Sequence, residues 1–339
     1  MRYVLAALAA LLVLPVPALA AAKSVFYTRE AVVAWADNYR HKPEPSRLPA
    51  AIEMLSKAGA LRDPDSAAFH VGFIAGVLGA NPRIAEKLVI KMLPLPEADQ
   101  WVVVRAIAYS GLPEWKTLLR NVAPRLPARQ AMVDQYIAGS LPTLDNIELD
   151  KNPTFLEKMQ MHVGIKVPTP EISFGKNPEL LDVLWGQYFA TGAYQSIYRI
   201  LSMLPWSKDR DMVDRLTVGS MAKVTLANNA TMYPDLLLLL KSMTKYQTEE
   251  IAKPLAEVIQ AAETAQAPRL KKEALAAIDE LKRKGPGYRR EMTVWGYVGQ
   301  GTIAVTCITL AVVSLTAAGI PCVVGGAVTS AALNYWTAQ

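Results

Sequence analysis

The chain contains only three histidines, the side chain that most often serves as a metal ligand or as an acid and base near neutral pH. His41, His70 and His162 lie far apart along the sequence. None has a cysteine nearby or a partner in an H-E-x-x-H arrangement. The sequence therefore does not indicate a histidine-rich zinc site, and we expect no metal and no cofactor.

A serine stands three residues before a lysine at three places, which is the spacing in penicillin-binding serine enzymes. These pairs are Ser173 and Lys176, Ser220 and Lys223, and Ser242 and Lys245. The companion S-D-N and K-T-G motifs are missing from the sequence, as are G-x-S-x-G and the phosphate-binding G-x-x-x-x-G-K-[ST]. We therefore expect neither a serine nucleophile nor a nucleotide site.

Paired carboxylates leave one enzymatic alternative open. The two acids that flank a glycosidic bond come together only in the folded protein, so sequence spacing cannot exclude them. A hydrolase acting on cell-wall glycan therefore stays an alternative, and a groove with two carboxylates about 5 to 9.5 Å apart would favour it. No Glu or Asp stands out in the sequence, and on balance we expect a protein that is not an enzyme.

The segments that must position any site are predicted to be helical. Between residues 23 and 284, apolar residues recur at three- and four-residue spacing, and alternating strand patterns are missing. Asn-Pro dipeptides predict helix starts at Asn81-Pro82, Asn152-Pro153 and Asn177-Pro178, because asparagine can cap free amides and proline fits the first helical turn. The fold class is therefore all-α: an irregular α-solenoid or helical bundle of antiparallel helix pairs, with a C-terminal apolar helical hairpin.

Composition divides the chain into six parts. Turn-forming residues are densest between residues 140 and 177, which indicates a boundary between two helical lobes. The predicted parts are a signal peptide (1–20), an N-terminal helical lobe (21–139), a Pro-rich linker with one short helix (140–177), a second helical lobe (178–284), a basic and aromatic juxtamembrane segment (285–297) and a membrane hairpin (298–336).

One segment of the second lobe, LLDVLWGQYFATGAYQSIYRILSML, resembles a helix-turn-helix in uncharacterised exported bacterial α-helical proteins with an LW-x-x-(F/Y)-F-A-T-G signature. The matching residues are Leu184, Trp185, Tyr188, Phe189, Ala190, Thr191 and Gly192. The resemblance covers about 25 of the 339 residues and implies no known activity. We interpret Trp185 and Tyr188 as core residues, with ligand contact as the alternative, and expect Gly192 to end its helix in a left-handed conformation.

The amino terminus has the pattern of a cleaved secretory signal peptide. Arg2 precedes an apolar run from Val4 to Leu14, and Ala18-Leu19-Ala20 forms an A-x-A cleavage site. An uncleaved anchor is the alternative, but about 12 apolar residues span only roughly 18 Å as a helix, against about 30 Å of hydrocarbon. We therefore expect export to the periplasmic side of the inner membrane.

The carboxyl terminus has a long uncharged segment, from Val294 to Trp336. A single helix over residues 298–334 would be about 55 Å long, nearly twice the hydrocarbon thickness, so a hairpin bent at Gly319 fits a bilayer better. Basic and aromatic residues flank the hairpin and are predicted to lie at the membrane interface: Arg283, Lys284, Arg289, Arg290, Trp295, Tyr297, Tyr335 and Trp336. The alternatives are a buried core hairpin and a tail that inserts conditionally.

These patterns favour an exported, membrane-tethered helical binding or scaffold protein of the cell envelope, anchored by its C-terminal hairpin. The expected partners are membrane lipid with anionic headgroups and another envelope protein. A net charge of +6 spread over 339 residues does not indicate a nucleic-acid partner. A membrane-perturbing protein of the pore type is the second alternative beside the glycan hydrolase.

Overall fold

A computed structural model describes residues 26–63, 67–146, 178–210 and 212–284. Every regular element within these ranges is a helix, so the predicted all-α fold class is confirmed for this part of the chain. The predicted signal peptide, the linker's short helix and the C-terminal hairpin lie outside the described residues.

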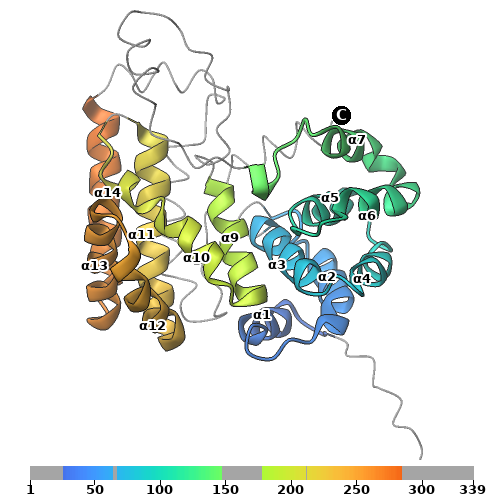
Figure 1. Ribbon diagram of the computed structural model, residues 1–339, viewed down its shortest axis with the longest axis horizontal. Coiled ribbons are helices and arrows are strands. Elements are labelled where there is room, and N and C mark those ends of the chain that lie inside the picture. The colour runs from blue at the N-terminus through green and yellow to red at the C-terminus, as the bar shows by residue number, and fades with distance from the viewer. Residues whose placement is uncertain (1–25, 64–66, 147–177, 211, 285–339) are drawn as a thin grey trace, which may run out of the picture.

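Thirteen α-helices make up the described structure (Figure 1). The first half contains α1 (Arg29–Asn38), α2 (Leu48–Lys57), α3 (Ala67–Ala80), α4 (Ala85–Met92), α5 (Gln100–Ala108), α6 (Trp115–Val122) and α7 (Gln130–Ala138). The second half contains α9 (Pro178–Thr191), α10 (Tyr194–Leu201), α11 (Val213–Met232), α12 (Pro234–Met243), α13 (Glu249–Glu263) and α14 (Ala267–Lys284).

The structure tests one of the three predicted helix starts. Helix α9 is described from Pro178 onward and Asn177 lies outside the described residues, so the start at Asn177-Pro178 stays a prediction. The prediction at Asn81-Pro82 is wrong, because α4 begins only at Ala85. The Asn81 amide instead donates to the carbonyl of Val77 at 2.8 Å and so serves the end of α3. Asn152 lies outside the described ranges.

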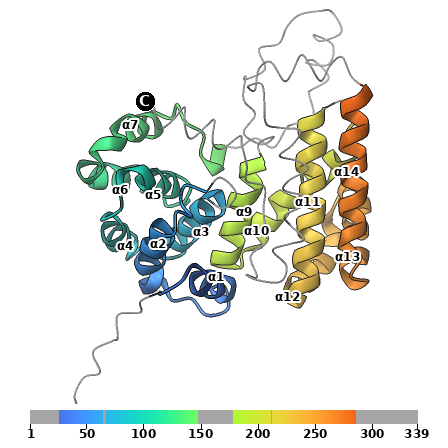
Figure 2. The same cartoon turned by 180° about the vertical axis from the view of Figure 1, so that it is seen from behind.

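Helix α3 lies in the centre of the molecule and joins the two halves. All of its residues from Ala67 to Leu78 are buried. A helix that is apolar on all sides must have neighbours on all sides. Helix α9 packs along α3 from the second half, while α5 and α4 pack against it from the first, and Figures 1 and 2 both show α3 and α9 side by side.

Glycines allow the backbones of α3 and α9 to touch. A Cβ atom added at Gly72 would lie 2.0 Å from the carbonyl oxygen of Val183, and one added at Gly186 would lie 2.1 Å from that of Phe69. At Gly76 an added Cβ would lie 2.7 Å from the Cβ of Ala190. Small residues four apart on each helix therefore permit a crossing that no larger side chain would fit.

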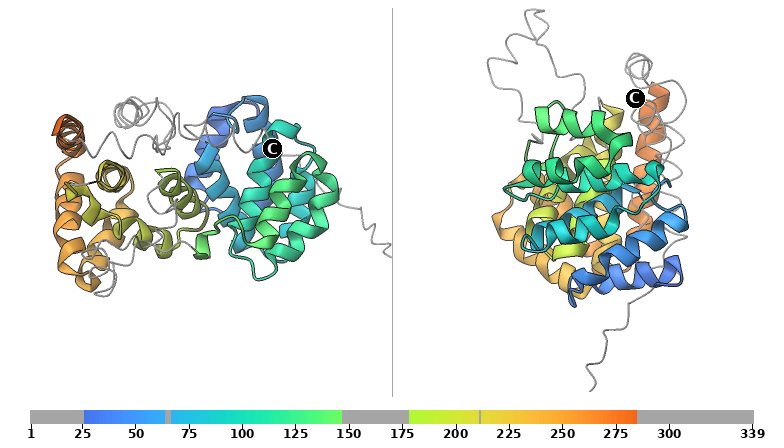
Figure 3. Two further views of the ribbon diagram at one scale, coloured as in Figure 1. Left: turned by 90° about the horizontal axis from the view of Figure 1, so that it is seen from above. Right: turned by 90° about the vertical axis from the view of Figure 1, so that its right-hand side faces the viewer.

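Helix α11 is the centre of the second half. It contacts α13, α14 and the short 3₁₀-helix η7 (Leu204–Lys208), and its other neighbours are α12 and α9. The view from above in Figure 3 shows α9, α11 and α14 nearly end-on in one row. The indole nitrogen of Trp185 on α9 donates to the Thr225 hydroxyl of α11 at 3.1 Å, which fixes one buried contact between these helices.

Candidate functional site

A polar and aromatic cluster, the Arg40 cluster, joins α1 to the second half. The Arg40 side chain is only 3% exposed, and its Nε and Nη2 donate to the two carboxylate oxygens of Asp235, both at 3.2 Å. Its guanidinium carbon lies 4.6 Å from the ring centroid of Tyr233, 5.2 Å from that of Phe189 and 5.4 Å from that of Tyr188. Bidentate pairing and cation–π contact thus stabilise a charge that burial would otherwise penalise.

Three ionisable groups around Arg40 have pKa values displaced away from neutral pH. The Tyr233 hydroxyl donates to the carboxylate of Asp37, and burial together with that carboxylate raises the pKa of Tyr233 far above its usual value. Burial raises the pKa of Tyr188 to about 12. Burial would raise the pKa of Asp235, but the hydrogen bond and charge of Arg40 outweigh it and lower that pKa. The cluster is therefore suited to holding two segments together rather than to transferring protons.

A second buried ion pair joins α5 to α9. The guanidinium of Arg105 donates to the carboxylate of Glu179, and the rings of Tyr109 and Trp101 lie 5.9 and 5.4 Å from the guanidinium carbon. Burial disfavours the charge on Arg105, but the carboxylate of Glu179 outweighs it and raises the pKa of the guanidinium. Burial also raises the pKa of Tyr109 and that of the adjacent Tyr136. This pair, like the one at Arg40, connects residues far apart in sequence.

The structure brings two acids together but does not expose them. Glu179 and Asp182 stand three residues apart on α9, so their side chains leave adjacent turns. They are 4% and 0% exposed, and Arg105 neutralises Glu179. A general acid must touch the glycosidic oxygen, so a pair buried in this way does not favour the hydrolase alternative.

The described serine and lysine pairs are engaged in other contacts. Ser220 is buried on α11, and Lys223 forms an ion pair with the carboxylate of Glu257. The Ser242 hydroxyl donates to the carbonyl of Leu239 at 2.7 Å, and Lys245 is exposed. Ser173 and Lys176 lie outside the described ranges. Neither described pair forms a hydrogen bond between its own serine and lysine.

His70 is buried in α3 beside a small hollow between α1, α2 and α3, where its neighbours are mainly apolar. Its Nε2 makes no hydrogen bond to any described residue. Burial, helped by the charge of Arg29, lowers the pKa of the imidazole from 6.5 to about 4. His41, by contrast, is half exposed, and its Nε2 lies 3.7 Å from the carboxylate of Asp235.

His70 is expected to weaken the fold in mild acid. Between pH 6.5 and about 4 the unfolded chain binds a proton at His70 that the folded chain does not, so the free energy of unfolding falls as the pH falls through this range. The loss approaches about 3 kcal/mol at the lower end. The substitution His70→Leu should remove this loss of stability at low pH, whereas His41→Leu should leave it unchanged. Urea unfolding of the three proteins at pH 7 and pH 4.5 measures the difference, and equal pH dependence in all three would contradict it.

The predicted membrane-interface residues are described only at their beginning. Arg283 and Lys284 form the last residues of α14. The remaining six, Arg289, Arg290, Trp295, Tyr297, Tyr335 and Trp336, lie outside the described residues. No helix in the ranges from 26 to 284 that the structure describes is both long enough and apolar enough to cross a bilayer.

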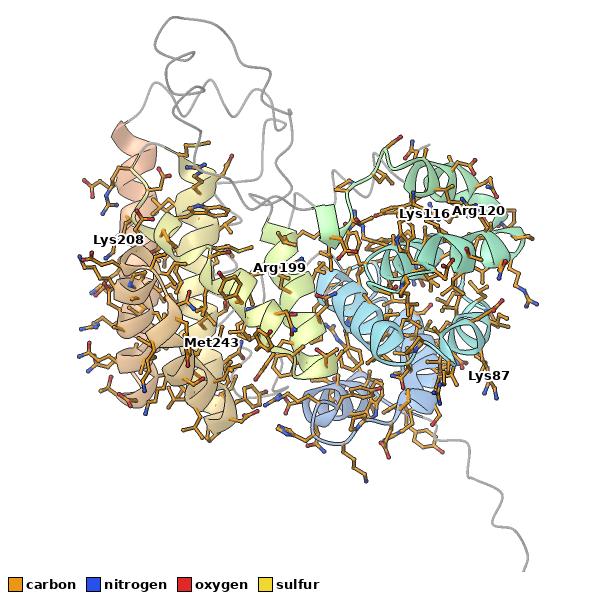
Figure 4. The ribbon with its side chains drawn as sticks, in the orientation of Figure 1. Lys87, Lys116, Arg120, Arg199, Lys208 and Met243 are labelled. Carbon is orange, nitrogen blue, oxygen red and sulfur yellow. The ribbon has the colours of Figure 1, made fainter. Side chains whose placement is uncertain are left out.

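Exposed aromatic residues gather on one short helix. Tyr194 and Tyr198 are 58% and 52% exposed, and their spacing of four residues places them on one side of α10. Arg199 is the next residue after Tyr198, and Figure 4 shows it near the centre of the molecule in that view. Tyr246, which is 85% exposed, ends the 3₁₀-helix η8 (Thr244–Tyr246) that follows α12. We call Tyr194, Tyr198 and the exposed Gln195 between them the α10 face.

The motif that carries the family resemblance has a structural role. Trp185 and Tyr188 are buried, which confirms their interpretation as core residues, and Tyr188 and Phe189 surround Arg40. Gly192 has a φ of +67° and ends α9 in the expected left-handed conformation.

The contacts of Arg40 were not predicted from the sequence, because its partner Asp235 is 195 residues away. The glycines at Gly72 and Gly76 were the available signal for a close helix crossing.

Comparison with known proteins adds no functional assignment: no family model, no curated protein and no solved structure matches this chain.

Proposed function

We propose that this protein is an exported, membrane-tethered helical binding or scaffold protein of the cell envelope. In this proposal the helix pairs form an irregular solenoid-like or bundle-like body. A signal peptide directs export, and the apolar segment at 298–336 anchors the body to the periplasmic side of the inner membrane as a hairpin. Its partners are anionic lipid headgroups and another envelope protein, which binds the α10 face.

The observation that carries the binding role is the exposed tyrosine pair of the α10 face. Tyrosine and arginine are enriched among the residues that dominate binding energy in protein interfaces. A tyrosine also supplies a large contact area with little loss of side-chain freedom. The neighbouring Ile197, Ile200 and Leu201 are buried, so α10 is fixed to the core and presents Tyr194 and Tyr198 on a rigid support.

The contacts of the buried polar groups support a structural role for the helical body rather than a catalytic role. Arg40 pairs with Asp235 of α12 and Arg105 pairs with Glu179 of α9, so both pairs link the two halves. Asp99 accepts from the Ser56 hydroxyl at 2.6 Å beside Arg62. Each of these charged groups has its partner on another element of the fold. Such pairs favour one arrangement of the neighbouring helices.

The course of α14 supports the tether. The helix continues to Lys284 and so carries Arg283 and Lys284 directly to the start of the juxtamembrane segment at 285–297. Basic residues near an anionic bilayer surface each contribute about 1 kcal/mol. The uncharged segment that follows is long enough for one full pass and a shorter return arm.

A photo-crosslinking experiment in the native cell tests the α10 face. A benzophenone amino acid at Gln195 should yield one discrete adduct with an envelope protein. The double substitution Tyr194→Ala, Tyr198→Ala should remove most of this adduct. The loss of an interface anchor costs about 2 kcal/mol or more, which is roughly 30-fold in affinity.

The matched control is Tyr27→Ala with Tyr246→Ala, which removes two tyrosines that are more exposed but far apart in sequence. The control should retain the adduct. Equal adduct yield from both double variants, with unchanged helical circular dichroism, would show that the tyrosine pair is not a binding surface.

A further inference from the structure

A second exposed surface, the basic face, lies on α4, on α6 and on the 3₁₀-helix η3 (Ala123–Arg125) that follows α6. Its members are Arg83, Lys87, Lys91, Arg120 and Arg125, and all five are exposed. The four-residue spacing of Arg83, Lys87 and Lys91 places them along one side of α4 and the turn before it. Helices α4 and α6 pack together, and the Asn121 amide of α6 lies 3.4 Å from the Glu86 carboxylate of α4.

The cations of the basic face differ from most others in the described chain. None of the five forms an ion pair or a hydrogen bond through its side chain with another described residue. Elsewhere most exposed lysines meet an acid: Lys57 contacts Glu53 at 2.6 Å, and Lys241 contacts Glu263 at 2.6 Å. The nearby Glu114 instead accepts from the hydroxyl of Thr117 at 3.0 Å. The basic face therefore holds positive charge that the fold does not neutralise.

The position of the basic face decides which acidic partner fits it. Figure 4 places Lys87 and Arg120 at one end of the longest axis and Lys208, which pairs with Glu257 of α13, at the other. Helix α14, which leads to the tail, lies at the Lys208 end (Figure 1). In the proposed tethered arrangement the chain leaves the described body for the bilayer at Lys284 of α14, and the basic face lies at the other end of the longest axis.

We propose that the basic face docks an acidic surface of a second protein on the side of the molecule remote from the membrane. The inference rests on the proposed tether, which orients the body. Complementary charge speeds association and selects the partner. Ile84, an exposed apolar residue beside Arg83, supplies contact area within the row of charges, as the centres of protein interfaces usually do.

Binding of a fluorescent poly-glutamate peptide to the full chain in neutral phosphatidylcholine nanodiscs tests the proposal. The variant Lys87→Glu, Lys91→Glu, Arg120→Glu should weaken binding at least tenfold at low salt, and the difference should shrink at about 1 M salt, where the screening length is about 3 Å. The control Arg210→Glu, Lys245→Glu, Lys272→Glu changes the net charge by the same amount on exposed residues elsewhere, and it should weaken binding less than threefold.

Equal weakening by both triple variants would overturn the proposal, because it would show attraction to net charge alone. Flotation with vesicles containing phosphatidylglycerol separates the lipid alternative: the basic-face variant should float like the unaltered chain. If that variant alone loses flotation, the basic face contacts lipid and the proposed protein partner is wrong. If even the unaltered chain fails to enter neutral nanodiscs, the tether fails, while the peptide assay can still be read on the full chain in detergent.

Discussion

Replacing Gly186 with alanine is expected to destabilise the protein by about 3 kcal/mol or more, although alanine favours a helix over glycine by about 1 kcal/mol. The added Cβ would lie 2.1 Å from the carbonyl oxygen of Phe69 and 2.6 Å from the amide nitrogen of Phe73. Both are backbone atoms, so no side-chain rotation can relieve the overlap. Helices α3 and α9 would have to separate, and the two halves would lose their main contact.

The sign of the effect makes this prediction specific. If α9 were an isolated surface helix, Gly186→Ala would stabilise it, so a rise in the melting temperature would contradict the described crossing of α3 and α9. Gly59→Ala is the control, because an added Cβ there meets no atom within 4 Å and only the left-handed φ of +74° opposes it. That strain costs about 1–2 kcal/mol. Thermal unfolding followed by circular dichroism compares the two variants.

The sequence predicted the helical nature of the fold because helical periodicity is a local property. Apolar spacing and proline positions indicated an all-α chain, and every regular element of the described residues is a helix. Asn81 shows the limit of such signals. An asparagine between two helices can cap the second or close the first, and the sequence does not show that its amide reaches back to Val77.

The pairing of the two halves could be predicted only in part. The small residues at Gly72, Gly76 and Gly186 are visible in the sequence and are compatible with a close crossing, but they do not identify the partner helix. The contacts of Arg40 with Asp235 and of Arg105 with Glu179 connect residues 195 and 74 positions apart, and no local pattern encodes such a match. The α10 face was likewise hidden, because Tyr194 and Tyr198 read as ordinary members of an amphipathic helix.

Removal of the tail should change the location of the protein completely. A chain that ends at Lys284 keeps α14 but lacks the uncharged segment, so it should leave the membrane fraction, whereas the full chain should resist alkaline extraction. The full-length variant Arg289→Glu, Arg290→Glu should stay in the membrane, because burial of apolar helix surface contributes far more than two headgroup contacts of about 1 kcal/mol each.

Flotation of alkaline-extracted membranes on a sucrose gradient, with the full chain and the chain ending at Lys284 expressed side by side, tests the central claim most directly. The full chain should rise with the lipid, and the shortened chain should stay in the soluble layer with its helical circular dichroism intact. If the full chain stays in the soluble layer as well, the tail does not hold the body at a membrane and the tethered scaffold is the wrong account.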